Sequence, residues 1–172
     1  MKLWIMLVPT LSLIVMGLAL AGVQAKTNFS GTWLLDKSRS NLSALTGMGA
    51  DAEKAQNATV TMVVTHEGTT LQVTRTLKTA SEETTQTQTY NTDGTPTNNV
   101  GPRGGTIVSK TSWEGENLVI VSTRNMAILW KDVSIQGKTT WSLSADGNTL
   151  LIDSHIRSPR GEQQFKGVFE KQ

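Results

Sequence analysis

From residue 57 onward, the chain is a series of short segments in which apolar and polar residues alternate. Side chains two residues apart lie on the same face of a strand, so this alternation indicates strands with one buried face and one wet face. Turns separate the segments, at Glu67-Gly68, Asp93-Gly94, Glu114-Gly115, Asp146-Gly147 and Pro159-Arg-Gly161. Glycine in such turns tolerates the positive φ that tight hairpins need. The pattern therefore predicts an all-β domain made of consecutive hairpins.

We predict about nine strands in this domain. Their ranges are 31–36, 59–65, 71–78, 83–90, 106–113, 118–123, 132–143, 149–157 and 163–170. Residues 126–130 either start the strand 132–143 early or form an apolar loop. An up-and-down meander is the simplest topology, because each strand is followed by its neighbour. Closing the sheet removes its edges and places the apolar faces inside, so the predicted fold is a single antiparallel up-and-down β-barrel.

Three one-sided strand faces define the predicted interior. They are Val133, Ile135, Gly137, Thr139, Trp141 and Leu143; Leu71, Val73, Arg75 and Leu77; and Phe165, Gly167 and Phe169. Arg75 is the charged member of an apolar face, and residues 83–90 carry almost no apolar side chain on either face. A barrel with a partly polar cavity accommodates both features. Alternatively, Arg75 extends its head into water near a strand end and residues 83–90 are a frayed edge.

Residues 38–56 differ from the rest of the domain. They contain Gly47, Gly49, several alanines and a stretch at 50–56 that is compatible with a short helix. This segment is either a mobile lid over a barrel mouth or a long connection between the first strand and the first hairpin.

The N-terminal residues have the pattern of a secretory signal peptide. Lys2 supplies a positive charge, residues 3–21 are almost wholly apolar, and Val23-Gln24-Ala25 places small residues at a cleavage site. We expect cleavage after Ala25, with cleavage after Ala21 and an uncleaved membrane anchor as alternatives. Residues 1–25 are thus a predicted signal peptide, and residues 26–172 form one barrel domain that we expect to be periplasmic or secreted.

Charge and cysteine content exclude several classes of function. The formal net charge is +2 and no run of Lys or Arg is present, which disfavours nucleic acid as a partner. No amphipathic basic helix suggests binding to a membrane surface, and we expect no membrane span once residues 1–25 are removed. The chain has no cysteine, so thiolate catalysis, cysteine-based metal sites and a cysteine-linked lipid anchor are excluded. A domain of this size can build its core without disulfides.

Four ordered motifs run through the predicted domain. They are Phe29-Ser-Gly-Thr-Trp33, Tyr90-Asn-Thr-Asp93-Gly94, Trp113-Glu-Gly115-Glu-Asn-Leu118-Val-Ile120 and Trp141-Ser-Leu143-Ser-Ala-Asp146-Gly147-Asn-Thr149-Leu150. The first resembles the start of lipocalin-like (calycin-type) barrels, whose first strand carries Gly-x-Trp. The ordered set resembles small exported bacterial proteins of uncharacterised function that begin Phe-Ser-Gly-Thr-Trp. The resemblance implies that Trp33 packs at the closed barrel end under a basic residue from a late strand, namely Arg157, Arg160 or Lys166.

The sequence contains no recognisable catalytic constellation. His66 adjoins a turn, where we expect it to be solvated, and it is far from His155 along the chain, so no zinc-binding pair is present. Asp153, Ser154 and His155 are consecutive, and adjacent strand residues point to opposite faces, so they cannot form a triad with one another. No Gly-x-Ser-x-Gly elbow or phosphate-binding loop occurs. We therefore predict a protein that is not an enzyme and has no cofactor and no metal.

Two hypotheses about function remain open. In the first, the barrel holds a small apolar or amphipathic ligand, and the candidate binding residues are Val73, Arg75, Trp113, Ile120, Trp141 and Leu143. Arg75 would then meet a carboxylate or phosphate of that ligand. In the second, a filled barrel acts as an inhibitor-like or interaction module through loops 38–56, 98–105 and 125–131, with an apolar patch at Met126, Ile128, Leu129 and Trp130.

Overall fold

Ten strands form the domain in the part of the chain that the structure describes. The computed structural model describes residues 26–41, 57–101, 104–128, 131–159 and 161–172. The strands are β1 (Gly31–Leu35), β2 (Thr59–Glu67), β3 (Thr70–Lys78), β4 (Glu83–Asn91), β5 (Thr97–Val100), β6 (Thr106–Glu114), β7 (Asn117–Ile128), β8 (Lys131–Leu143), β9 (Thr149–Ser158) and β10 (Gly161–Lys171). The predicted signal peptide, 1–25, and most of the predicted lid, 42–56, lie outside the described residues.

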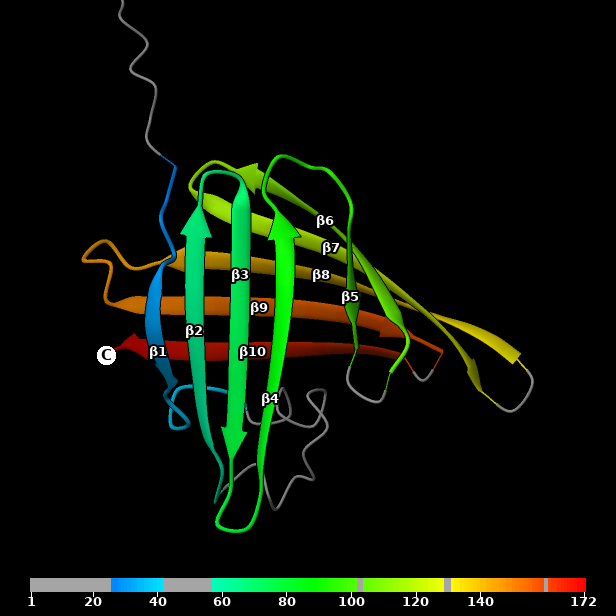
Figure 1. The fold of residues 1–172 in the computed structure, drawn as a ribbon, viewed down its shortest axis with the longest axis horizontal. Helices are drawn as coiled ribbons and strands as arrows, with labels where there is room; N and C mark the ends of the chain where they lie inside the picture. The colour runs from blue at the N-terminus through cyan, green and yellow to red at the C-terminus, as the bar shows by residue number, and fades with distance from the viewer. Residues whose placement is uncertain (1–25, 42–56, 102–103, 129–130, 160) are drawn as a thin grey trace, which may run out of the picture.

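The strands form one antiparallel sheet that wraps into a nearly closed barrel. Their order is β4-β3-β2-β1-β10-β9-β8-β7-β6-β5, so the first and last strands are neighbours and all other pairings join consecutive strands. Figure 1 shows β2, β3 and β4 crossing in front of β7 to β10, with the interior between these two layers. The predicted antiparallel meander is confirmed except between β4 and β5, which follow each other in the chain but are not paired. The glycines of all five predicted turns have positive φ.

The prediction missed one strand and shortened another. Thr97–Val100 is strand β5, which pairs with β6, although residues 98–105 were expected to form a loop. Its Asn-Asn centre has no apolar alternation, so periodicity could not detect it. Strand β7 continues to Ile128, so residues 125–128 extend that strand and belong neither to a loop nor to the start of β8. The side chains of the predicted apolar patch, Met126 to Trp130, lie outside the described residues.

Side chains close the barrel where β4 meets β5. These strands are the two ends of the sheet, and no ladder of backbone bonds joins them among the described residues. Asn99 takes the place of a ladder: its Oδ1 accepts from Thr89 N at 2.8 Å and its Nδ2 donates to Thr89 O at 2.9 Å. Gln86 Nε2 also donates to Val100 O at 2.8 Å. The primary amide of Asn99 thus imitates a strand backbone across the seam.

The Gly-x-Trp tryptophan is a core residue, as the resemblance implied. Trp33 is fully buried, and its Nε1 donates to Phe29 O at 3.0 Å. The cation over its ring is Lys171, with Nζ 5.5 Å from the ring centroid. Two of the predicted cations were therefore wrong, because Arg157 pairs with Glu162 and Lys166 lies farther along β10. The third, Arg160, lies outside the described residues. Lys171 faces Trp33 because the two residues are register partners on β10 and β1.

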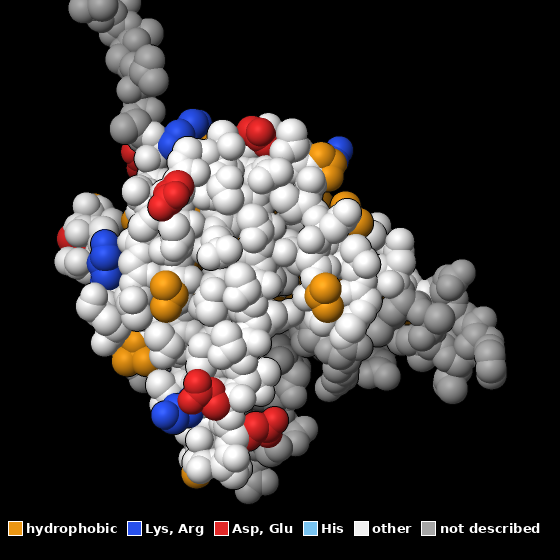
Figure 2. All heavy atoms as spheres, viewed as in Figure 1, with side chains coloured by type: hydrophobic (Ala, Val, Ile, Leu, Met, Phe, Trp, Pro, Cys, Tyr) orange, Lys and Arg blue, Asp and Glu red, His pale blue; other side chains and the backbone are white. Residues whose placement is uncertain are grey.

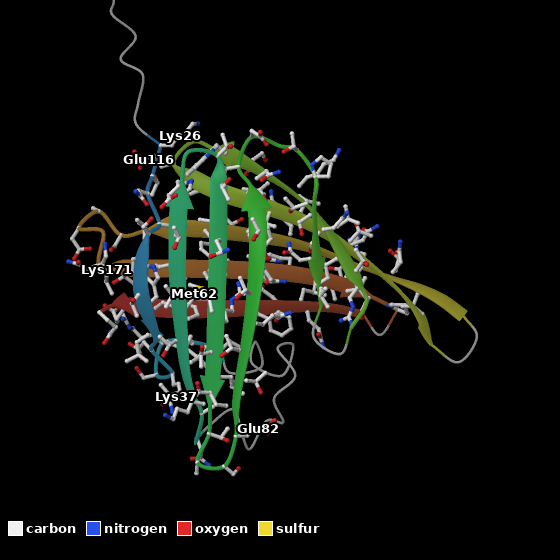
Figure 3. The ribbon with its side chains drawn as sticks, in the orientation of Figure 1. Lys26, Lys37, Met62, Glu82, Glu116 and Lys171 are labelled. Atoms are coloured by element: carbon white, nitrogen blue, oxygen red, sulfur yellow. The ribbon has the colours of Figure 1, made fainter. Side chains whose placement is uncertain are left out.

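An aromatic cluster fills one end of the barrel. The Phe29 ring stacks on His66 and Trp113, at centroid distances of 6.2 and 6.0 Å, and meets Trp141 edge-on at 5.7 Å. His66 is thus half-buried in this cluster instead of solvated, and burial lowers its pKa. Lys26 lies over the Trp113 ring and close to Glu116, where the chain enters the barrel (Figure 3). The cluster closes this end of the barrel with apolar and aromatic surface.

The outer face of β2 to β4 is polar but has little charge. Outward threonines pair across the strands, Thr74 with Thr87 at 2.9 Å and Thr76 with Thr85 at 3.1 Å between the hydroxyl oxygens. Figure 2 shows this face as mostly uncharged, with Lys, Arg, Asp and Glu near its margins. The alternation of β3 explains this polar outer face, because Leu71, Val73 and Arg75 point inward while their neighbours point to water.

Candidate functional site

The barrel encloses a cavity of about 230 Å³. Its walls come from both layers of the barrel and from the chain that follows β1. The lining residues are Leu35, Ser40, Asn41, Arg75, Gln88, Tyr90, Ile107, Ser109, Ile120, Ser122, Thr139, Trp141, Ile152, Ser154, Ile156, Phe165, Lys166, Gly167 and Phe169. Because these residues surround the space from eight strands, the cavity is the barrel interior and not a groove between loops.

Most of the cavity surface is apolar. Isoleucines from β6, β7 and β9 and aromatic rings from β8 and β10 make up this surface, namely Ile107, Ile120, Ile152, Ile156, Trp141, Phe165 and Phe169. Gly167 lies between the two phenylalanines, and a Cβ there would come within 2.8 Å of the Phe169 ring. Glycine at 167 therefore lets the Phe169 ring lie against the β10 backbone, and the apolar wall suits a hydrocarbon group.

A hydrogen-bonded polar cluster on β3 and β4 interrupts this surface. Gln88 Oε1 accepts a hydrogen bond from Arg75 Nη1 at 3.1 Å and another from the Tyr90 hydroxyl at 3.0 Å. Gln88 and Tyr90 are buried, and Arg75 is half-buried. Burial raises the pKa of the Tyr90 hydroxyl, and the Arg75 cation opposes this rise to a smaller extent. Tyr90 is therefore a neutral hydrogen-bond donor around pH 7.

Small hydroxyl groups line other parts of the wall. Thr139 and Ser154 share a hydrogen bond of 2.9 Å across β8 and β9. Glycine at 137 leaves room for the hydroxyl group of Ser122, because a Cβ at Gly137 would lie 2.9 Å from Ser122 Oγ. Trp141 Nε1 is buried with no hydrogen-bond partner among the described residues. The cavity therefore combines a large apolar surface with several uncharged polar atoms, the half-buried cation Arg75 on β3 and the exposed cation Lys166 on β10.

The chain after β1 reaches the cavity because it runs along β10. Asp36 N donates to Val168 O and Asn41 N donates to Lys166 O, both at 2.8 Å. Between these bonds, Val168 N donates to Ser40 Oγ at 2.9 Å. Arg39 binds Asp36 and also contacts Glu170. These contacts hold Ser40 and Asn41 at the cavity wall, directly before the segment 42–56.

The structure places three of the six predicted binding residues on the cavity wall: Arg75, Ile120 and Trp141. Val73, Trp113 and Leu143 also face inward, but they pack within or against the hydrophobic core and do not line the cavity. Alternation shows which face of a strand is internal. It does not show how far along the barrel the packed core ends and the cavity begins.

Gln88 and Tyr90 line the cavity but were not predicted as site residues. Both belong to the strand whose polar composition suggested either a frayed edge or a polar cavity. Strand β4 is an end strand of the sheet, but it pairs with β3 along its whole length, so its edge is not frayed. Its Gln88 and Tyr90 line the cavity, as the polar-cavity interpretation predicted. Their spacing of two residues was the available signal, because it places them on one face beside Arg75.

The described residues offer little for metal chemistry. Among them, no group of three His, Asp or Glu side chains is close enough to hold a metal ion. His155 is exposed, with its Nε2 3.4 Å from Asp153 Oδ1. In the same part of the chain, no helix has the length and hydrophobicity required to span a membrane.

The barrel is similar to solved lipid-binding structures, although no protein-family model and no curated protein match the sequence. Zebrafish ileal bile acid-binding protein with cholic acid has 16% identity and a TM-score of 0.59, covering 84% of this chain and 98% of that one. Lipid binding protein 8 of Caenorhabditis elegans has 16% identity and a TM-score of 0.57, covering 84% and 95%. Fatty acid-binding protein from Drosophila melanogaster brain has 17% identity and a TM-score of 0.55, covering 83% and 99%. The chain therefore has a calycin-type β-barrel fold, like these lipid-binding structures.

Proposed function

We propose that this chain is an exported binding protein whose barrel holds one small hydrophobic or amphipathic ligand. The observation that carries the proposal is the internal cavity, with its apolar wall of isoleucine, phenylalanine and tryptophan and its polar group at Arg75. A hydrocarbon group would lie against the apolar wall, and a polar head would face Arg75. The bile acid-, fatty acid- and lipid-binding proteins of similar fold support this class of ligand. We further propose that the chain acts in the periplasm or outside the cell after residues 1–25 are removed.

Two neighbouring positions on β7 provide a test of cavity binding. Ile120 lines the cavity, whereas Val121 points outward and is 51% exposed. The uncharged fluorescent probe N-phenyl-1-naphthylamine should bind the wild-type protein with enhanced emission. Ile120→Phe should weaken this binding at least tenfold by filling the cavity, and Val121→Phe should leave it unchanged. Equal binding by all three proteins would contradict a ligand site in the barrel.

Trp141 distinguishes a container from a filled barrel. In a container, Trp141→Ala should change probe binding in addition to lowering stability, because Trp141 lines the cavity and also packs against Phe29 in the core. In a filled barrel, its main effect would be a loss of stability of roughly 3–5 kcal/mol, as for other large-to-small core substitutions. Urea unfolding and probe titration of the same variant separate these outcomes.

Native mass spectrometry of protein exported by its own host and purified without detergent tests the natural ligand. A discrete additional mass that is lost on denaturation supports the proposal and gives the mass of the ligand. The same spectrum shows whether the mature chain begins at Lys26.

A further inference from the structure

Two hydrogen-bond donors in the cavity converge on a single acceptor that belongs to the protein itself. Arg75 Nη1 and the Tyr90 hydroxyl both donate to Gln88 Oε1, at 3.1 and 3.0 Å. Arg75 comes from β3, and the other two residues come from β4, two positions apart. All three line the cavity, so the oxygen they share belongs to its wall.

A neutral amide oxygen is a weak partner for this pair of donors. A guanidinium group has five N–H donors in a planar fork that matches both oxygens of a carboxylate, and such a two-bond ion pair adds energy and geometric specificity that one bond to a neutral amide lacks. Among the ion pairs of the described residues, none involves Arg75. The cation therefore faces the cavity with an amide where its geometry suits an oxyanion.

We propose that Gln88 is a placeholder: its amide oxygen occupies the position that an oxygen of an anionic ligand head takes when the ligand binds. On binding, the Gln88 side chain turns away from that position, so Arg75 and Tyr90 donate to the ligand. This inference rests on the proposed function and adds a residue that determines which ligand heads are accepted.

The chemistry of the site favours a head with a single negative charge. Arg75 is the half-buried cation of this wall, whereas Lys166 is exposed. Arg75 and the neutral Tyr90 hydroxyl together balance one oxyanion, and Tyr90 stays protonated because burial raises its pKa. A neutral alcohol would have to displace the Gln88 oxygen without forming stronger bonds than those it breaks. A primary ammonium head would face Arg75 and be repelled. The expected order of affinity is carboxylate, then alcohol, then amine.

Three ligands with the same chain test this order, namely dodecanoate, dodecanol and dodecylamine, each titrated by displacement of N-phenyl-1-naphthylamine. Wild-type protein should bind dodecanoate at least tenfold more tightly than dodecanol. Gln88→Glu places a carboxylate permanently beside Arg75, so dodecanoate should lose at least tenfold in affinity while dodecanol changes little. Gln72→Glu is the matched control, because it makes the same chemical change at an exposed, outward position on β3. It should leave the ratio of the two affinities unchanged.

Gln88→Leu separates a placeholder from a structural residue. Removing the internal acceptor leaves Arg75 and Tyr90 unoccupied, so the affinity for dodecanoate should rise several-fold although unfolding occurs at lower urea. Unchanged or weaker dodecanoate binding in Gln88→Leu would overturn the placeholder role. If wild-type protein binds the three ligands equally, the inference fails and the proposed function stands. If it binds none of the ligands or the probe, both fail.

Discussion

Lys171 and Trp33 are register partners on β10 and β1, and the ammonium of Lys171 lies 5.5 Å from the centroid of the Trp33 ring. This contact joins β10, the last strand of the chain, to β1, the first, in the middle of the sheet order. Figure 3 shows Lys171 at the end of β10 beside β1. The tryptophan is fully buried and the lysine is exposed, so the cation covers the outer edge of the core.

Removing this cation should destabilise the barrel modestly. Lys171→Met should lower the free energy of unfolding by about 0.5–1 kcal/mol, the typical strength of an exposed cation–π contact. Lys171→Arg should retain most of this stabilisation, because a guanidinium also stacks on an indole. Urea unfolding measures the difference, with Lys166→Met as the matched control on the same strand. A loss at Lys166 equal to that at Lys171 would contradict the assignment.

Asn99 should be required for closure between β4 and β5. Asn99→Leu removes both hydrogen bonds to Thr89 and should destabilise the protein by roughly 1–3 kcal/mol. It should also speed hydrogen exchange at the Thr89 amide, measured by NMR. Asn98→Leu, at the neighbouring exposed position, is the control and should leave this exchange rate unchanged. Equal protection of Thr89 in both variants would show that the seam does not depend on Asn99.

Asp36 should contribute to stability at low pH. Hydrogen bonds from Ser38 and Arg39 lower its pKa from 3.8 to about 2. Because the folded-state pKa is the lower one, this contribution is complete above about pH 4 and disappears as the pH falls towards 2. Ser38→Ala should raise the pKa of Asp36, which an NMR titration of its carboxyl group measures. The stability of Asp36→Asn should fall less between pH 4 and 2 than that of the wild type, and a parallel fall would contradict this linkage.

Protonation of His66 should destabilise the folded protein. Burial lowers its pKa below the ordinary value of 6.5, so the unfolded chain takes up the proton more readily. The contribution of His66 to stability is therefore complete above pH 6.5 and is lost as the pH falls through the lowered folded-state pKa. His66→Phe retains a ring beside Phe29 and Trp113 and should reduce the slope of unfolding free energy between pH 7 and 5. An unchanged slope would show that groups other than His66 cause the pH dependence of stability in this range.

Local patterns in the sequence determined the hairpins and the direction of most side chains. Asp146-Gly147 and Glu114-Gly115 could be predicted as turns, because a tight turn needs positive φ and glycine is the residue that adopts it most easily. The inward position of Arg75 followed from the period of two in a strand. The lipocalin-like motif at Trp33 likewise pointed to a barrel with a tryptophan in its core.

Only the tertiary structure decided which distant residues meet. Lys171 lies over Trp33 because of the register between β1 and β10, and the sequence contains no local signal for that register. Asn99 and Thr89 are paired because the sheet ends there, which depends on the curvature of the whole barrel. The same holds for the cavity: Trp113 and Trp141 both face inward, and only the packing of the aromatic cluster separates the filled end from the hollow part. Whether a side chain points inward is decided by its own strand. How deep it lies along the barrel and which residues it contacts are decided by the closed barrel.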